Sequence, residues 1–367
     1  MTNQCSLSLV GLSQWYLDYT NFQKCLCIYC VRNSQINTEC TSSLVFIKIM
    51  VRRMESNLSF LITNIVILVL QFSGIILNGF ILFMFIRSKS LRRNNAVQLL
   101  FFLTITDFLH ALTTLPYISY MTALWHPFRI NLNAYFVMIS STPLVIQLKV
   151  NLTLTIAIAT ERTLALFHPL LYRKVSSATY SLTSLLIGIA FACNDLFLEF
   201  LLSPIVAHRN CAAIGCFVSD DFRFYWGTSN MIMGLFVIVL TMMVLFKLRS
   251  IQNNSKDTGS TVGKGTSKLS QANRTSLGIL LTSLLFVTLP SVGVGFVEMI
   301  GFSIFKTVGP FYIVGLLCAG ACNSIVYVVL NRDMRRLAKN CLTGRGASLV
   351  SPSTRVEVTN FRSTAII

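Results

Sequence analysis

Seven long apolar segments constrain this chain more than any other feature of its sequence. They lie at about residues 60–86, 96–119, 134–160, 180–206, 225–247, 277–304 and 308–330. Each is near or above the roughly 20 residues that an α-helix needs to cross the hydrocarbon of a bilayer. Each is apolar all round rather than along one stripe, which is typical of a membrane span and not of a surface helix. The sequence therefore predicts an all-α membrane protein that folds as a seven-helix bundle.

The composition argues against a soluble protein. Of the 367 residues, 54% are hydrophobic and 12% are charged, whereas a soluble domain carries about 25% charged residues. The net charge of +17 is spread between the apolar segments, so it does not indicate nucleic-acid binding. The four histidines are scattered without the spacing of a metal site, and no nucleotide-binding motif is present. We expect no cofactor, no metal and no enzymatic activity.

The distribution of Lys and Arg predicts the orientation in the membrane. The segments after the first, third and fifth spans, together with the tail, carry twenty of these residues, and the opposite loops carry four. Because positive residues gather on the cytoplasmic side, we expect a multi-pass plasma-membrane protein with its N-terminus outside. Seven spans do not divide into equal inverted halves, which argues against a transporter. A seven-helix ligand-gated channel or transporter stays open as the alternative.

The sequence is expected to have three parts. These are an extracellular tail over residues 1–56, a seven-span domain over 57–341 and a cytoplasmic tail over 342–367. Residues 1–53 lack the pattern of a secretory signal, and we interpret them as a gene-model extension or a poorly ordered tail. Asn57-Leu58-Ser59 is a sequon, so Asn57 is a candidate for N-glycosylation.

Three cysteines are candidates for covalent chemistry. Cys211 and Cys216 flank the second outer loop and could pair with each other or with one of the five cysteines before the first span. Cys341 follows a basic segment, Asn331 to Leu337, that predicts a short amphipathic eighth helix on the inner leaflet. Cys341 is therefore placed for palmitoylation, and an inert cysteine is the alternative.

Polar residues inside the spans are costly and point to buried contacts. Asp107 in the second span needs partners, and three amides on other spans are the natural ones. The alternatives are a polar cluster that holds helices together and a network that rearranges during function. The amides are Asn78, Asn151 and Asn323.

Charged residues in the outer half of the bundle suggest a ligand site. Lys149 lies thirteen residues before Arg162 on the third span, or about 20 Å along a helix. Asp195 and Glu199 share one face of the fourth span at a similar depth, so we expect a Lys149–Asp195 pair. That pair either stiffens spans three and four or forms the polar floor of a ligand pocket. Glu298 at the top of the sixth span could line its mouth.

The third span ends in Glu161-Arg162-Thr163, and His168-Pro169-Leu170-Leu171-Tyr172 follows. One interpretation is that Arg162 merely extends to lipid phosphates. The stretch also resembles the end of the third helix in rhodopsin-like G-protein-coupled receptors, where an acid-Arg-Tyr triplet precedes a Pro-Leu-x-Tyr loop. Likewise, Asn323-Ser324-Ile325-Val326-Tyr327 resembles the Asn-Pro-x-x-Tyr box of these receptors, with Ser324 replacing the proline.

The resemblance implies functional roles for several residues. It implies a hydrated network at Asn78, Asp107 and Asn323 that repacks on activation. Pro290 in the sixth span can kink that helix because it removes a backbone hydrogen bond. The implied activation switch consists of Glu161, Arg162, Tyr327 and Pro290.

Departures from the common receptor pattern narrow the resemblance. The top of the third span has no cysteine, and Thr288 stands where an aromatic residue would precede Pro290. Together with Gln147-Leu148-Lys149 and the His168–Tyr172 run, this resembles the BC class of nematode serpentine chemoreceptors over about residues 57–341. The resemblance implies a sensory-cell receptor that binds a small extracellular chemical, such as an odorant or pheromone, and activates a heterotrimeric G protein. The polar, basic segment from Lys247 to Ser276 is expected to be a mobile loop.

Overall fold

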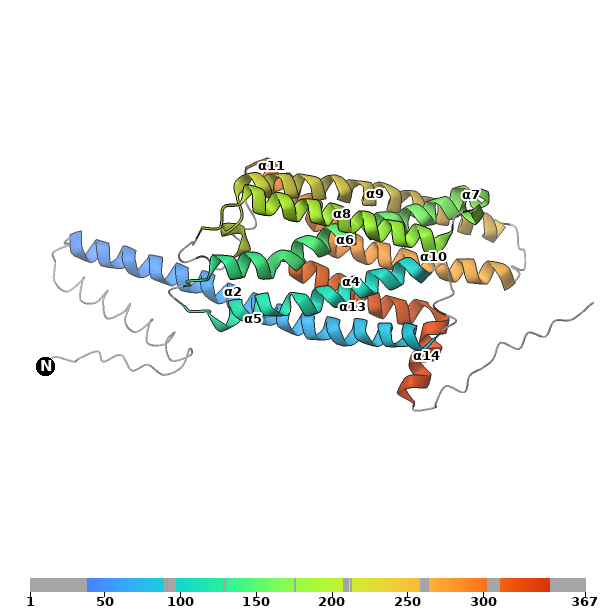
Figure 1. Ribbon diagram of the computed structural model, residues 1–367, viewed down its shortest axis with the longest axis horizontal. Coiled ribbons are helices and arrows are strands. Elements are labelled where there is room, and N and C mark those ends of the chain that lie inside the picture. Colours follow the sequence, from blue (N-terminus) through green and yellow to red (C-terminus); the bar gives the residue numbers. More distant parts are fainter. Residues whose placement is uncertain are drawn as a thin grey trace, which may run out of the picture. The chain divides into compact units, whose positions relative to one another are not determined.

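The computed structural model describes residues 38–88, 91, 97–127, 130–174, 176–206, 211, 213–257, 264–301 and 311–343. The regular elements in these residues are all helical (Figure 1). The chain divides into two compact units, one made of Met1–Phe60 with His126–Arg129 and the other of Leu61–Trp125 with Ile130–Ile367. The cavity and the buried charges discussed below belong to the second unit.

The helices follow one another along the chain as α2 (Thr38–Arg87), α4 (Gln98–Thr113), α5 (Leu115–Ala123), α6 (Ala134–Phe167), α7 (Pro169–Lys174), α8 (Ser177–Leu202), η2 (Ile214–Cys216), α9 (Asp220–Asp257), α10 (Lys264–Ser283), η3 (Leu284–Thr288), α11 (Leu289–Met299), α13 (Phe311–Leu330) and α14 (Arg332–Leu342). Within the described part of the chain, seven helical stretches are long and apolar enough to cross a membrane. They are Asn57–Arg87, Gln98–Ala123, Ala134–Phe167, Ser177–Leu202, Asp220–Ile251, Asn273–Met299 and Phe311–Leu330. The predicted all-α bundle of seven spans is confirmed.

Helices extend beyond the predicted spans at several ends. α9 continues to Asp257 and α10 begins at Lys264, so the expectation of a mobile loop from 247 to 276 is wrong for most of that segment. Its polar residues include good helix formers, and charge alone does not end a helix. α2 already begins at Thr38, within the segment interpreted as a tail. Residues 1–37 and 344–367, the rest of the two expected tails, lie outside the described residues.

α6 is the central helix of the bundle and contacts α4, α8 and α9 (Figure 1). Its first turn is capped by Asn133, whose side-chain oxygen accepts a hydrogen bond from the Phe136 amide at 3.2 Å. Its end at Phe167 precedes His168-Pro169, where the proline disfavours helical backbone in the residue before it. Because α6 is enclosed by other helices, its charged residues are kept away from lipid.

The sixth span contains a π-helical segment that the sequence did not predict. η3 covers Leu284–Thr288, and α11 begins directly after it with Pro290 in its first turn. Pro290 has no amide hydrogen, so the carbonyl four residues earlier, on Phe286, loses its helical donor. Gly315 of α13 lies close to that carbonyl. Any larger residue at this position would clash, because its Cβ atom would overlap the Phe286 oxygen. Irregular turns of this kind often lie at functional positions.

The predicted amphipathic eighth helix is present as α14. Asn331 caps it by accepting hydrogen bonds from the amides of Asp333 at 3.0 Å and Met334 at 3.2 Å. Met334 and Ala338 are buried against the bundle, while the arginines between them are exposed. This division suits a helix that lies along a membrane surface.

Candidate functional site

A buried ion pair joins α6 to α8. Lys149 Nζ lies 3.0 Å from Asp195 Oδ2, and both side chains are 2% exposed. Lys149 Nζ also donates a hydrogen bond to Ser229 Oγ on α9 at 2.8 Å. The structure thus brings together the two residues that were expected to pair, and an ammonium group at this depth would be costly without such a partner.

Hydrogen bonds extend this pair toward the outer surface of α8. The Tyr225 hydroxyl on α9 donates to Asp195 Oδ1 at 3.0 Å. Asn194 Nδ2 donates in turn to the Tyr225 hydroxyl at 3.0 Å, and the Asn194 side chain is exposed. A polar chain therefore runs from the outside of the bundle to buried Lys149. Tyr225 and Ser229 were missed in the sequence, although their spacing of four residues on one helix face was an available signal.

A cavity of about 590 Å³ lies beside the ion pair, a volume within the roughly 300–1,000 Å³ of small-molecule pockets. α6, α8 and α9 supply its walls. A few polar groups line the cavity, and most of its lining surface is apolar. The lining residues are Lys149, Phe191, Asn194, Asp195, Phe224, Tyr225, Thr228, Ser229, Ile232 and Met233.

Neither of the two glutamates proposed for the ligand site is among the residues that line this cavity. Glu199 follows Asp195 by one turn of α8 and is 1% exposed, yet it does not line the cavity. Neither of its carboxylate oxygens has a hydrogen-bond partner among the described residues. Glu298 on α11 packs against Gly227 on α9. A Cβ atom added to Gly227 would lie 3.5 Å from both Cβ and Cγ of Glu298. A role of Glu298 at the mouth of the ligand site therefore stays a prediction.

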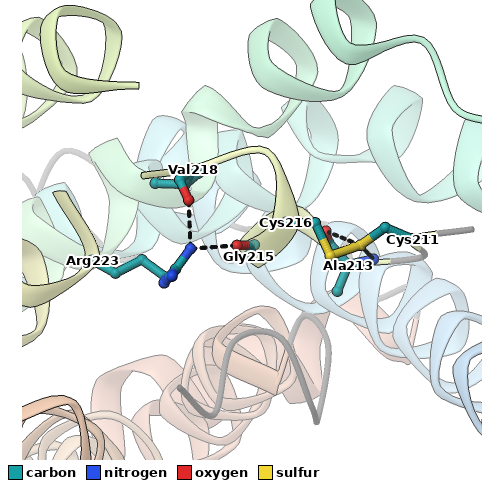
Figure 2. The surroundings of a disulfide bond; sticks show 6 residues. All are labelled: Cys211, Ala213, Gly215, Cys216, Val218 and Arg223. Atoms are coloured by element: carbon teal, nitrogen blue, oxygen red, sulfur yellow. Dashed lines mark hydrogen bonds between the residues drawn. A yellow bond between two sulfur atoms is a disulfide. The ribbon is translucent and has the colours of Figure 1, made fainter. Parts of the chain in front are cut away.

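The loop between α8 and α9 is closed by a disulfide between Cys211 and Cys216 (Figure 2). Just beyond it, the guanidinium group of Arg223 on α9 donates hydrogen bonds to the backbone carbonyls of Gly215 and Val218 (Figure 2). The loop is thus held on the fifth span by an arginine, whereas the common receptor pattern holds it on the third span by a disulfide. The sequence did not indicate the role of Arg223, because the acceptors are backbone carbonyls and leave no side-chain pattern.

Asp107 on α4 is buried at the centre of a polar cluster. Its Oδ1 accepts hydrogen bonds from Gln147 Nε2 at 2.9 Å and from Asn151 Nδ2 at 3.4 Å, both on α6. Gly320 of α13 also packs against Asp107. A Cβ atom added to Gly320 would lie only 3.1 Å from the Asp107 Cγ. Asn323, one turn beyond Gly320, is also buried.

Asn78, which was expected to be a partner of Asp107, makes different contacts. Its Oδ1 accepts a hydrogen bond from Ser324 Oγ on α13 at 2.7 Å. Its Nδ2 donates to the Gly74 carbonyl of its own helix at 3.0 Å. Ser324, which stands where the common receptor box has proline, therefore links α13 to α2.

At the opposite end of α6, Arg162 is 2% exposed and forms an ion pair with Glu161, with Arg162 Nη2 and Glu161 Oε2 3.0 Å apart. The Tyr172 hydroxyl of α7 donates a hydrogen bond to Glu161 Oε1 at 3.2 Å. Burial, and then the negative charge of Glu161, raises the pKa of Tyr172 above its ordinary value. The phenol therefore keeps the proton that it donates to Glu161.

The remaining residues of the implied switch, Tyr327 and Pro290, lie on two other spans, α13 and the sixth span. Tyr327 on α13 is 3% exposed, and its ring centroid lies 5.7 Å from that of Phe85 on α2. Its hydroxyl has no hydrogen-bond partner among the described residues. In this conformation Tyr327 is therefore packed in the core, and no contact joins it to Arg162 among the described interactions. Pro290 lies directly after the π-helical segment of the sixth span.

The candidate modification residues differ in accessibility. Asn57 lies within α2, and its Nδ2 donates a hydrogen bond to the Pro127 carbonyl at 2.9 Å. Attachment of a glycan at Asn57 would require this bond to open. Cys341 on α14 is exposed and free, as acylation requires.

Comparisons with known proteins agree with the seven-span architecture. The family model described as "Serpentine type 7TM GPCR chemoreceptor Srbc" matches residues 56–334, a range that contains all seven spans. No curated protein matches the chain. No group of three or more His, Cys, Asp or Glu side chains in the described residues could hold a metal ion.

Proposed function

The chain belongs to the Srbc family of serpentine seven-transmembrane G-protein-coupled chemoreceptors, and from this premise we propose that it detects a small extracellular chemical at the Lys149–Asp195 site. The family consists of receptors and not of enzymes, and it implies a ligand, a G protein and the lipid bilayer as partners. The proposed ligand is an odorant or pheromone, and the proposed location is the plasma membrane of a sensory cell. The proposed response is activation of a heterotrimeric G protein.

The proposed orientation places the N-terminus outside the cell. The excess of Lys and Arg in the segments after the first, third and fifth spans supports it. It puts the Cys211–Cys216 loop on the extracellular side, and Arg162, α7 and α14 on the cytoplasmic side. The exposed arginines of α14 would then face anionic lipid headgroups.

The buried position of Arg162 is the observation that carries this proposal. An arginine that only extended to lipid phosphates would point outward, but Arg162 is 2% exposed and held by Glu161. Glu161 is held in turn by Tyr172, so two side chains, one directly and one through the other, keep the guanidinium group inside the bundle. This arrangement fits a resting state in which the G-protein contact is withheld.

A single helix connects the ligand site to this end of the bundle. Lys149 and Arg162 both lie on α6, about 20 Å apart along its axis. Ligand at Lys149 would favour the conformation in which Arg162 is released, which is a population shift between two packings. The π-helical segment and Pro290 give the sixth span an irregular point at which it can move.

Arg162→Ala tests this proposal in cells that express the receptor and a G protein. Arg173→Ala is the matched control, because Arg173 is a nearby exposed arginine on α7. At equal surface expression, we expect a pool of small chemicals to activate signalling in the wild type and in Arg173→Ala but not in Arg162→Ala. Ligand-gated current or flux that persists in Arg162→Ala would instead support the channel or transporter alternative.

A further inference from the structure

The cavity beside Lys149 opens sideways through the wall of the bundle. Three of its apolar lining residues are exposed on the outside of α8 and α9. Phe191 and Phe224 are each 51% exposed, and Ile232 is 48% exposed. These helices are the fourth and fifth spans, so the mouth of the cavity faces lipid and not the extracellular solution.

A polar residue lies at this lipid-facing mouth. Asn194 lines the cavity and is exposed between Phe191 and Phe197, which is 65% exposed. An amide that faces hydrocarbon is costly unless its hydrogen bonds are satisfied. Asn194 Nδ2 donates to Tyr225, but no hydrogen bond to its Oδ1 is found among the described residues. The mouth therefore offers an acceptor to any molecule that enters from the bilayer.

The inner end of the cavity also offers hydrogen bonds, and its charges cancel. Lys149 uses one donor on Asp195 and one on Ser229, and an ammonium group has three. Its third donor has no partner among the described residues. Because Lys149 and Asp195 neutralise each other, a charged ligand group would leave an excess charge in a low-dielectric site. An uncharged group that both donates and accepts hydrogen bonds fits this floor best.

We propose that the cavity binds a single-chain amphiphile with an uncharged hydrogen-bonding head, such as a long-chain alcohol or primary amide, which enters from the outer leaflet. The head lies against Lys149 and Asp195, and the chain leaves past Phe224 and Ile232 into lipid. Asp195 is seven residues before the end of α8 at Leu202, or about 10 Å from it, which places the head in the outer half of the membrane. This inference rests on the proposed function only in taking Lys149–Asp195 as the ligand site.

Photolabelling of the full chain in lipid vesicles tests the proposal without a G protein. The probe is dodecanol that carries a diazirine and a terminal alkyne. We expect light-dependent labelling on α8 and α9 at the cavity mouth, with competition by unlabelled dodecanol and dodecanamide. The dodecanoate anion and dodecyltrimethylammonium, which share the chain but carry a charged head, should compete poorly. Equal competition by the neutral and charged compounds would overturn the assignment of the head group.

Two matched pairs of variants locate the site. Ile232→Trp fills the mouth and should reduce labelling about tenfold, whereas Leu235→Trp, on a lipid-exposed position of α9 outside the cavity lining, should label like the wild type. Asn194→Leu removes the polar group at the mouth and should also reduce labelling. Its control, Cys193→Leu, changes the neighbouring exposed residue. All four side chains are exposed, so none of these changes disturbs the core.

The outcomes separate this inference from the proposed function. Equal labelling of Ile232→Trp and Leu235→Trp would overturn the lipid-facing site, even if a chemical drives signalling that depends on Arg162. Specific labelling at the cavity in a protein that never activates a G protein would support the site and contradict the proposed function.

Discussion

The hydroxyl oxygens of Thr155 on α6 and Ser283 on α10 lie 3.0 Å apart. Thr155 already donates its hydrogen to the Asn151 carbonyl at 2.8 Å. Since a hydroxyl has one hydrogen to donate, Ser283 is the donor to Thr155. Ser283 is the last residue before the π-helical segment, so this buried bond joins the third span to the irregular point of the sixth. We interpret it as a contact of the resting conformation.

Ser283→Ala should therefore raise ligand-independent signalling. A lost buried hydrogen bond costs about 1 kcal/mol, which shifts a two-state equilibrium about fivefold. Basal second-messenger levels at matched surface expression measure the shift. Thr282→Val is the control, because that hydroxyl bonds only to the Gly278 carbonyl of its own helix. Unchanged basal signalling in Ser283→Ala would remove Thr155–Ser283 from the account.

Tyr172→Phe should also raise basal signalling, by roughly threefold to tenfold. A hydrogen bond to a carboxylate contributes about 1.5–3 kcal/mol when it is well shielded from water. It contributes less in a half-buried position such as that of Tyr172. The raised pKa of Tyr172 fixes the pH dependence. The phenol keeps its proton below its ordinary pKa of about 10, and the bond is lost only as the pH rises above that range. The wild type should therefore show no rise in basal signalling between about pH 6 and 9 from this group. A basal level in Tyr172→Phe equal to that of the wild type would contradict the role given to this bond.

Substitutions of Lys149 and Asp195 separate a structural ion pair from a ligand site. Lys149→Met or Asp195→Leu alone leaves one buried charge without its partner, which costs about 3–5 kcal/mol, whereas replacing both is often nearly neutral. We expect the single variants to lose surface expression and thermal stability, and the double variant to recover both. The double variant should still fail to respond to ligand, because the polar floor is gone. A full ligand response in a well-expressed double variant would assign the pair a purely structural role.

The disulfide of the loop between α8 and α9 can be read directly by mass spectrometry. Peptide mapping without reduction should yield Cys211 and Cys216 in one cross-linked peptide, which excludes pairing with the cysteines before the first span. The closed loop is short, with a sequence separation of five, so chain entropy predicts that its removal costs about 2 kcal/mol. Cys211→Ser/Cys216→Ser should accordingly lower the unfolding temperature by a few degrees. Recovery of either cysteine linked to an N-terminal peptide would contradict the observed connectivity.

The spans and the Lys149–Asp195 pair were predictable because strong physical terms fix them. An apolar run of membrane length has few alternatives to a span. A lysine inside a membrane span must find an acid, and the rise per residue of a helix places Asp195 at its level. The break at His168-Pro169 follows in the same way from the geometry of proline.

The partners of Asp107 were harder to predict because they depend on how each helix is rotated about its axis. A helix that is apolar all round has no stripe to fix that rotation. Asn78 was therefore expected to contact Asp107 but bonds to Ser324, and Gln147 was overlooked although it makes the shorter contact. The π-helical segment and the contacts of Arg223 involve backbone carbonyls, which every residue carries, so no side-chain pattern announces them.

Nucleotide exchange on a purified G protein tests the central claim most directly. The receptor would be reconstituted in lipid vesicles with a heterotrimeric G protein, and GTP uptake would be measured with and without an active chemical. The account predicts that the chemical accelerates uptake with the wild type and with Arg173→Ala, and that Arg162→Ala abolishes the acceleration while remaining folded. Equal acceleration by Arg162→Ala, or ion flux through the vesicles without any exchange, would contradict it.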